Sequence, residues 1–102
     1  MDSLIQTAQN LAGEFALARP SFTAGAVGAA LKSASGKVYT GICVELACGI
    51  GFCAEHAAMA EMLKMRETVI DTIVACKVDE IVAPCGRCRE MMYQVDARNR
   101  SA

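Results

Sequence analysis

The stretch Pro-Cys-Gly-Arg-Cys-Arg at residues 84–89 is the most informative part of this sequence. Cys85 and Cys88 lie three positions apart at the start of a predicted helix, so their sulfurs share one face and can reach one metal ion. A second stretch, Cys-Ala-Glu, begins another predicted helix at Cys53. The pattern predicts zinc held by the three cysteines, because thiolates are good zinc ligands. Three protein ligands leave the fourth position for water, and Glu55 is placed to reach that water without binding the metal.

The position of these cysteines also bears on their charge. Both groups stand at predicted helix starts, where free N–H groups and the helix dipole favour thiolate over thiol. Three thiolates and Zn²⁺ sum to a formal charge of −3 + 2 = −1, so bound water should ionise less readily than the pKa of about 7 on a zinc held by neutral histidines. Positive charge is therefore expected close to the metal. Arg87 lies between two proposed ligands, and Arg89 and His56 are further candidates.

A Cys-x-x-Cys pair by itself is also typical of a redox dithiol or of half of a structural zinc site. The combination with an upstream ligand-x-Glu on a separate helix is more specific. His-x-Glu followed by Pro-Cys-x-x-Cys is the signature of zinc deaminases, and cysteine can replace the histidine. The present chain has this variant, with Cys53 in the first place. The motif therefore indicates zinc-dependent deaminase chemistry.

Six cysteines in 102 residues would also suit three disulfides in a small secreted protein. However, the first residues lack the basic and apolar segments of a signal peptide, and 54% hydrophobic residues are enough for a core without disulfides. We therefore expect a reduced, cytoplasmic chain that forms a single domain over residues 1–102. Cys43, Cys48 and Cys76 are expected to be buried as small hydrophobic residues.

The charge and hydropathy of the chain argue against two classes of partner. Lys and Arg number 10 and Asp and Glu number 11, which gives 10 − 11 = −1. A chain this neutral is a poor candidate for contacts with nucleic-acid phosphates, so no polynucleotide partner is expected. No apolar run reaches the roughly 18 residues that cross a bilayer, so no membrane segment is expected.

Hydrophobic periodicity predicts three helices and three strands. The expected order is a helix from the N-terminus to Pro20, a strand over 25–32, a turn over 33–36, a strand over 38–45, a helix over 54–65, a strand over 72–76 and a helix over 85–96. The first two strands should form a hairpin. The later strand–helix–strand connection predicts an α/β fold with a mixed, partly parallel sheet and helices on its faces.

Taken in order, these motifs resemble the cytidine deaminase superfamily, in its small branch with three cysteine ligands. The resemblance covers roughly residues 27–93, beginning with Val-Gly-Ala-Ala-Leu and ending after the second cysteine stretch. It implies a three-layer α/β/α fold, one zinc ion per subunit and hydrolytic removal of an exocyclic amine from a pyrimidine nucleoside. It also implies homo-oligomers, commonly tetramers. Family members continue past the third helix with one or two strands and a helix, so we expect the natural domain to be longer than this chain.

The resemblance also assigns roles to single residues. The three cysteines named above correspond to the zinc ligands. Glu55 corresponds to the glutamate that takes a proton from water, passes it to the ring and protonates the leaving ammonia. The backbone N–H of Ala54 corresponds to the donor that holds the base carbonyl oxygen. Glu45 corresponds to the glutamate that binds the sugar hydroxyls.

Several positions depart from the family's pattern around the substrate. Gly25 stands where a phenylalanine usually packs on the base, and Cys43 and Leu46 replace two asparagines at the sugar site. Cys43 would therefore line the pocket where the sugar binds. His56 replaces the usual arginine after Cys-Ala-Glu, and the stretch at 84–89 is similar to that of a blasticidin S deaminase.

That similarity favours Arg87 over His56 as the residue that offsets the negative charge of the cluster. It also leaves blasticidin S or another aminonucleoside as an alternative substrate. A second alternative is a catalytically silent, zinc-stabilised assembly domain. Such a domain would have a buried fourth ligand in place of the water.

Overall fold

The computed structural model describes residues 2–101, which form helices and strands in alternation. The helices are α1 (Asp2–Leu11), α2 (Ala54–Lys64) and α3 (Gly86–Val95), with two short 3-10 helices, η1 (Ala47–Gly49) and η2 (Ala97–Ser101). The strands are β1 (Phe15–Ala16), β2 (Thr23–Ser33), β3 (Val38–Glu45), β4 (Ile70–Cys76) and β5 (Ile81–Val82). The predicted α/β class and the predicted hairpin, which is β2 and β3, are confirmed.

The strands form one sheet in the order β3-β2-β4-β5, with β1 paired to the start of β2. Every pairing between these strands is antiparallel, so the predicted mixed sheet is wrong for the described part of the chain. The strand order gives the reason. α2 connects two strands, β3 and β4, that run in the same direction because both are antiparallel to β2. However, β2 lies between them, and neither strand therefore has a parallel neighbour.

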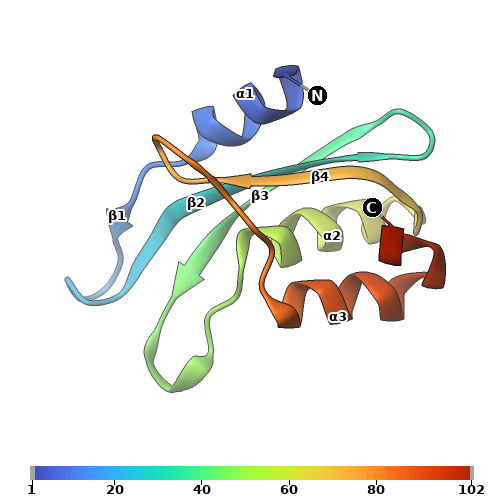
Figure 1. Cartoon of the computed structure of the whole chain (residues 1–102). Coiled ribbons are helices and arrows are strands. Elements are labelled where there is room, and N and C mark those ends of the chain that lie inside the picture. Colours follow the sequence, from blue (N-terminus) through green and yellow to red (C-terminus); the bar gives the residue numbers. More distant parts are fainter. Residues whose placement is uncertain (1, 102) are drawn as a thin grey trace.

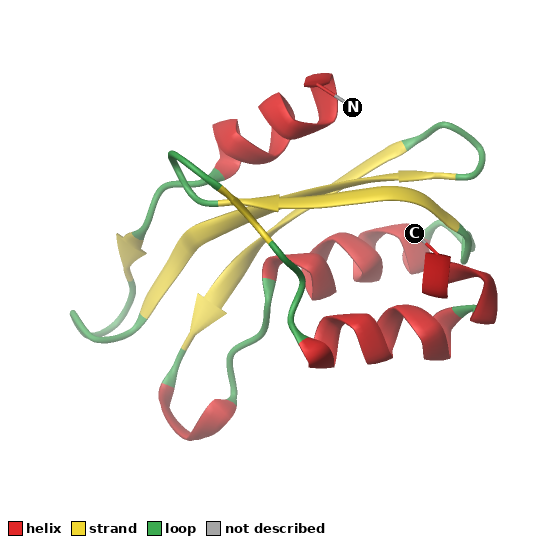
Figure 2. Ribbon diagram, viewed as in Figure 1, coloured by secondary structure: helices red, strands yellow, loops and turns green. Residues whose placement is uncertain are grey.

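Helices cover both faces of the sheet, which confirms the three-layer α/β/α arrangement (Figure 1). α1 lies over β2 and β4 on one face, whereas α2 and α3 lie on the other (Figure 2). Two glycines allow the helices to approach closely. A Cβ atom at Gly28 would lie 2.4 Å from the carbonyl oxygen of Ala8 in α1. A Cβ atom at Gly41 would lie 2.5 Å from the Cβ of Ala57 in α2.

The main hydrophobic core lies between the sheet and the α2–α3 layer. Leu31 of β2 and Met59 and Met62 of α2 are fully buried there, and Met92 joins α3 to them. A smaller cluster lies under α1 and includes Leu4 and residues from β2 and β4. The central strand β2 is therefore buried on both faces, which explains its almost continuous run of small apolar residues.

The first helix is shorter than the sequence predicted. α1 ends at Leu11 instead of near Pro20, and Phe15, whose spacing fits the apolar face of the helix, lies in β1. The N–H of Gly13 already donates to the carbonyl oxygen of Gly25 at 2.7 Å, which begins the pairing with β2. Strand pairing thus outweighs the local helical spacing, as tertiary context often does.

The remaining predicted elements agree with the structure to within two residues at either end. β5 and the two 3-10 helices had no counterpart in the prediction.

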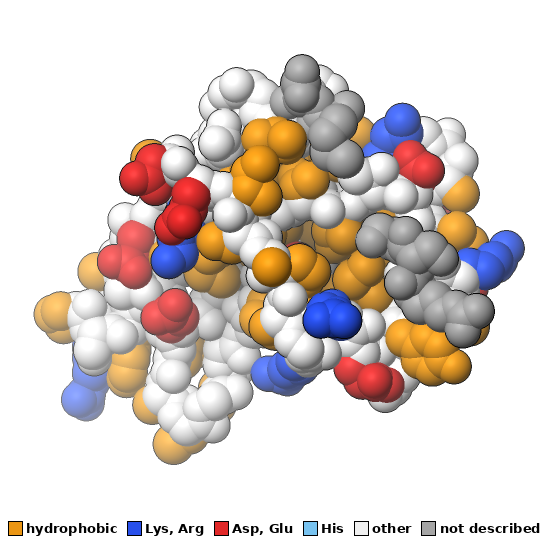
Figure 3. Space-filling model, viewed as in Figure 1, with side chains coloured by type: hydrophobic (Ala, Val, Ile, Leu, Met, Phe, Trp, Pro, Cys, Tyr) orange, Lys and Arg blue, Asp and Glu red, His pale blue; other side chains and the backbone are white. Residues whose placement is uncertain are grey.

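Within residues 2–101 the longest helix has 11 residues, so none of the described helices could cross a membrane. On the face shown in Figure 3, basic side chains are scattered singly and hydrophobic side chains gather in the middle.

Candidate metal centre and adjoining pocket

Three cysteines converge where the starts of α2 and α3 meet. Cys53 and Cys85 are the residues immediately before α2 and α3, with the extended backbone of N-cap residues, and Cys88 is fully buried in the first turn of α3. The Sγ atoms are 3.5 Å apart for Cys53 and Cys85, and 3.2 Å apart for Cys85 and Cys88. Sulfurs at two corners of a tetrahedral zinc site are about 3.8 Å apart, given bonds of about 2.3 Å. Small shifts would therefore fit these thiols around one ion.

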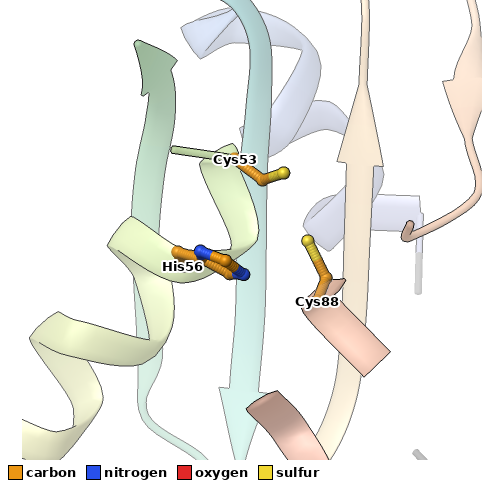
Figure 4. Close-up of side chains that lie close together, drawn as sticks. All are labelled: Cys53, His56 and Cys88. Atoms are coloured by element: carbon orange, nitrogen blue, oxygen red, sulfur yellow. The ribbon is translucent and has the colours of Figure 1, made fainter. Parts of the chain in front are cut away.

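His56 approaches the same cluster from the first turn of α2 (Figure 4). A ring nitrogen of His56 and the Sγ atoms of Cys53 and Cys88 all lie within 4.8 Å of one another. Its Nε2 atom is buried and has no hydrogen-bond partner among the described residues. Buried nitrogens usually have a partner, and one that protein atoms do not provide can be supplied by water or by a metal ion. Nitrogen and sulfur donors that converge in this way suit zinc, so the residues present fit the metal.

Burial and hydrogen bonding act in opposite directions on the three thiols. The N–H of Cys88 donates to the Sγ of Cys85 at 3.4 Å, and this hydrogen bond lowers the pKa of Cys85. Burial raises the pKa of both Cys53 and Cys88. The sequence predicted that both helix starts favour the thiolate form. The lowered pKa of Cys85 agrees with this prediction, whereas the pKa of Cys53, which makes no capping hydrogen bond, is raised. Metal binding must displace protons from the buried thiols, so zinc affinity should fall as the pH decreases.

A pocket of about 540 Å³ opens beside the thiols. This volume is in the range of small-molecule sites, about 300–1,000 Å³. The pocket brings together seven of the nine residues that the sequence singled out for the site, which are Cys43, Glu45, Cys53, Ala54, Glu55, Cys85 and Arg87. The other two, His56 and Cys88, lie outside its lining. Apolar residues from β3, the loop after it and the segment around β5 complete the walls.

Glu55 and Ala54 present polar groups to this pocket from the first turn of α2. The side chain of Glu55 is only 5% exposed, and its negative charge contributes to the raised pKa of Cys53 and Cys88. Ala54 is the first helical residue, so its N–H belongs to the group that a helix leaves without an intrahelical acceptor. A carboxylate and a backbone donor therefore stand beside the thiols.

Arg87 and His56 take different positions relative to the thiols. Arg87 is exposed, lines the pocket and forms no ion pair with the described residues. His56 lies against the sulfurs of Cys53 and Cys88. The side-chain positions thus favour His56 for close contact, and the charge-balancing role of Arg87 stays a prediction.

A bulge in β2 shapes the pocket wall and was not predicted. The register between β2 and β3 shifts between Ala24 and Gly28. Within this bulge the N–H of Val27 donates to the Sγ of Cys43 at 3.3 Å, so the thiol at the predicted sugar position is held by the backbone. The signal in the sequence was Gly25, whose φ of 88° is a conformation that glycine adopts without strain.

The cysteines outside the metal centre differ in exposure. Cys43 and Cys76 are buried, as predicted. The prediction is wrong for Cys48, which is exposed in η1, where its φ of 60° is left-handed. No residue of η1 is buried, so this turn offers the thiol no apolar surroundings.

Comparison with known proteins places the chain in a family. Residues 1–101 match the family described as the cytidine and deoxycytidylate deaminase zinc-binding region. The chain belongs to this family. The zinc-binding region and the convergent sulfur and nitrogen donors agree on zinc as the cofactor.

Individual relatives agree with this assignment. A probable cytidine deaminase from Dictyostelium discoideum is 34% identical over 67 residues, which are 63% of this chain and 46% of the relative. The chain thus spans about half the length of that relative. Among solved structures, cytidine deaminase from Mycobacterium tuberculosis superposes with a TM-score of 0.76 at 27% identity, covering 91% of this chain and 75% of that one. The enzyme from Burkholderia pseudomallei gives 0.71 at 31% identity, covering 90% and 73%.

Proposed function

We propose that this chain is a zinc-dependent hydrolase that removes the exocyclic amine of a cytidine-like pyrimidine nucleoside. The observation that carries the proposal is the convergence of three thiols beside a nearly buried glutamate, Glu55, at a pocket in a chain of this family. Cys53, Cys85 and Cys88 would hold the zinc ion. When bound there, zinc supplies Lewis acidity and lowers the pKa of water.

The protein's own residues account for the proton transfers of this reaction. Glu55 accepts a proton from water and delivers it to the ring nitrogen next to the amine. A carbon–oxygen bond then forms at the ring carbon as the hydroxyl group of the water adds there. Glu55 next takes the proton of this hydroxyl group and passes it to the amine, the carbon–nitrogen bond breaks, and ammonia leaves as the ring carbonyl forms. The low exposure of Glu55 keeps bulk water away from this transfer. The N–H of Ala54 would orient the base by donating to its carbonyl oxygen. Glu45 lines the same pocket and would accept a hydrogen bond from a sugar hydroxyl.

Replacing Glu55 tests this function directly. The Glu55→Gln variant keeps the size of the side chain but cannot carry the proton, so ammonia release should fall by about 100-fold to 10,000-fold. Bound zinc, measured by elemental analysis, should stay at the wild-type level. Glu90→Gln, on the exposed side of α3, is the matched control and should retain activity. A Glu55→Gln protein with full activity would contradict the proposed role.

The identity of the nucleoside is a finer part of the proposal. Cys43 and Leu46 give the pocket apolar walls where the family pattern has asparagines, and the sulfur of Cys43 already accepts the N–H of Val27. These positions thus provide fewer hydrogen bonds to a sugar, which keeps blasticidin S or another aminonucleoside as the alternative substrate. Ammonia release from cytidine, deoxycytidine and blasticidin S, compared as kcat/KM, would separate these substrates.

One observation favours a second candidate function. The Nε2 of His56 is buried and has no hydrogen-bond partner within residues 2–101, and a histidine beside the thiols is the kind of fourth donor that a silent, zinc-stabilised assembly domain would have. This candidate predicts stoichiometric zinc and no ammonia release from any nucleoside. Turnover that Glu55→Gln abolishes would exclude it.

A further inference from the structure

We propose that Phe52 stacks on the pyrimidine ring of the substrate and so holds the base beside Glu55. The inference rests on the proposed function for the class of ligand, and it adds an aromatic contact that the zinc and glutamate chemistry does not specify. It concerns how the base is positioned and assigns Phe52 no part in proton transfer.

Phe52 is the aromatic residue of the pocket beside the thiols. Among the described residues, no other phenylalanine or tyrosine belongs to the lining of this pocket. Phe52 directly precedes Cys53 and lies three positions before Glu55, and all three residues line the same space. A base that presents its exocyclic amine to Glu55 must lie among the lining residues close to this glutamate. Phe52 is therefore placed in the part of the pocket that the ring of a pyrimidine would occupy.

The other aromatic residues of the chain lie elsewhere. Gly25, where the family pattern has a phenylalanine that packs on the base, provides no side chain. The ring of Phe15 approaches this glycine, with its Cε1 3.3 Å from the position of an added Cβ, but Phe15 does not line the pocket. Phe22, Tyr39 and Tyr93 do not line it either. An aromatic contact to a base in this pocket therefore has to come from Phe52.

The backbone around Phe52 fixes its position. Phe52 and Val44 of β3 form an antiparallel bridge, in which the N–H of each residue donates to the carbonyl oxygen of the other at 2.9 Å. Gly51 permits this close approach, because an added Cβ there would overlap the carbonyl oxygen of Val44. The sheet thus anchors Phe52 before any ligand is present, so its backbone has little freedom to lose when a base binds.

The exposed surface of Phe52 favours a flat ring as its partner. The side chain is 42% exposed, although the next residues in the chain, Ala54 and Glu55, are buried. An apolar ligand surface packed against this ring would gain the free energy of burial that the open ring forgoes. Every nucleic-acid base has a π face that stacks on aromatic side chains. A pyrimidine therefore matches the open ring, in a pocket that provides few hydrogen bonds to a sugar.

Fluorine NMR of the zinc-loaded wild-type chain tests the contact. The chain has three phenylalanines, so labelling with 4-fluorophenylalanine gives three resonances, and Phe52→Tyr and Phe15→Leu identify two of them. Uridine is the probe, because it is the product expected from cytidine and is not consumed. We expect uridine to shift the Phe52 resonance and ribose at the same concentration to leave it in place. An unmoved resonance, or an equal shift with ribose, would overturn the proposal.

The variants give a second readout. Phe52→Leu keeps an apolar side chain but loses the aromatic face, so uridine affinity should fall by about 5-fold or more, whereas Phe52→Tyr should retain it. Phe15→Leu removes a ring outside the pocket and is the matched control. The wild type should also prefer uridine to dihydrouridine, whose saturated ring is not flat, and Phe52→Leu should lose this preference. Equal losses for both ligands in Phe52→Leu would show a structural role only and would overturn the stacking contact.

The results separate this inference from the proposed function. Ammonia release from cytidine with an unmoved Phe52 resonance would overturn the stacking contact alone. A shifted resonance without ammonia release would support the contact and count against the deaminase. A Phe52 resonance that responds to protein concentration and not to uridine would assign the ring to a contact between copies of the chain, which also overturns the proposal.

Discussion

At the scale of single residues, Asn99 shows how much one buried polar side chain can organise. It is 1% exposed and lies in η2, after α3. Its Oδ1 accepts the N–H of Ile70 at 2.8 Å, and its Nδ2 donates to the carbonyl oxygens of Thr68 and Met92 at 2.9 and 3.0 Å. Asn99 therefore satisfies backbone groups at the start of β4 and in α3 with one amide.

Removing this amide should destabilise the fold. Asn99→Ala removes the partner of the Ile70 N–H and of the Thr68 carbonyl oxygen, whereas the carbonyl oxygen of Met92 still accepts the N–H of Asp96. Each group that water cannot reach costs about 1–3 kcal/mol, so we expect a loss of about 2–4 kcal/mol in the free energy of unfolding. Urea denaturation followed by circular dichroism measures this loss. Asn10→Ala is the matched control, because Asn10 is exposed and accepts only from the side chain of Gln6. Equal stability of the two variants would refute the structural role of Asn99.

At the scale of elements, the approach of α2 to β3 positions the metal centre. Gly41 of β3 is the contact point, because an added Cβ would lie 2.5 Å from the Cβ of Ala57 and 2.7 Å from the carbonyl oxygen of Ala54. Both contacts are shorter than van der Waals packing permits. The first turn of α2 also carries Glu55 and follows Cys53, so its distance from the sheet fixes the geometry of the site.

A side chain at this glycine should therefore disturb the site as well as the core. Gly41→Ala forces α2 away from β3, and overpacking of this kind costs about 1–3 kcal/mol. We expect lower stability in thermal denaturation together with weaker zinc binding. Gly13→Ala adds the same methyl group where nothing lies within 4 Å, so it should leave zinc affinity unchanged. Wild-type zinc affinity in Gly41→Ala would show that α2 can shift without moving the ligands.

Hydrogen bonds also connect the β2–β3 hairpin to the loop after α2. Glu67 in this loop accepts hydrogen bonds from the hydroxyls of Ser35 and Tyr39. Both hydrogen bonds lower the pKa of Glu67, and the bond from Ser35 contributes more than the bond from Tyr39. The bond to Glu67 in turn raises the pKa of Tyr39 to about 12.

These shifts predict how stability depends on pH. Because the folded-state pKa of Glu67 is lowered, its contribution is present above the unfolded value of about 4.3 and is lost as the pH falls through the folded pKa. The raised pKa of Tyr39 gives a contribution that is complete below about pH 10 and is lost as the pH rises through about 12. Glu67→Gln should flatten the acid limb of Tm against pH, whereas Glu80→Gln should preserve it. An unchanged acid limb in Glu67→Gln would contradict this assignment.

At the scale of the whole molecule, apolar side chains remain exposed beside the pocket. Ile50 is 71% exposed and Phe52 is 42% exposed, and both lie in the loop between η1 and α2, with Leu46 at the end of β3. Neighbouring exposed apolar residues are a common feature of protein–protein contact surfaces. This surface supports the expectation of a homo-oligomer, which stays a prediction.

Sedimentation velocity checks that expectation. We expect the wild type to sediment as a dimer or tetramer and Ile50→Asp to shift toward the monomer, because a charge buried in an apolar contact is costly. Val78→Asp is the control, since Val78 is 67% exposed in the separate turn between β4 and β5. A monomeric wild type at micromolar concentration would rule out the oligomer.

Local features of the sequence were enough to predict most elements and the core of the site. The spacing of Cys85 and Cys88, the placement of Cys53 before a helix and the position of Glu55 two residues later depend only on neighbouring residues. Helical geometry then determines which of these side chains share a face. Turn residues and the spacing of apolar residues, which are also local features, predicted the hairpin and the buried helix α2.

Tertiary structure decided the features that depend on distant contacts. Pairing with β2 placed Phe15 in a strand instead of a helix, and the position of β2 between β3 and β4 made the sheet antiparallel. Packing of α2 and α3 on one face brought His56 to the thiol of Cys88 in the other helix. The spacing of residues along the chain specifies only which side chains share a face of one helix or strand. Which elements meet depends on how their apolar faces are buried together, and this burial decides which side chains come together at the candidate metal centre.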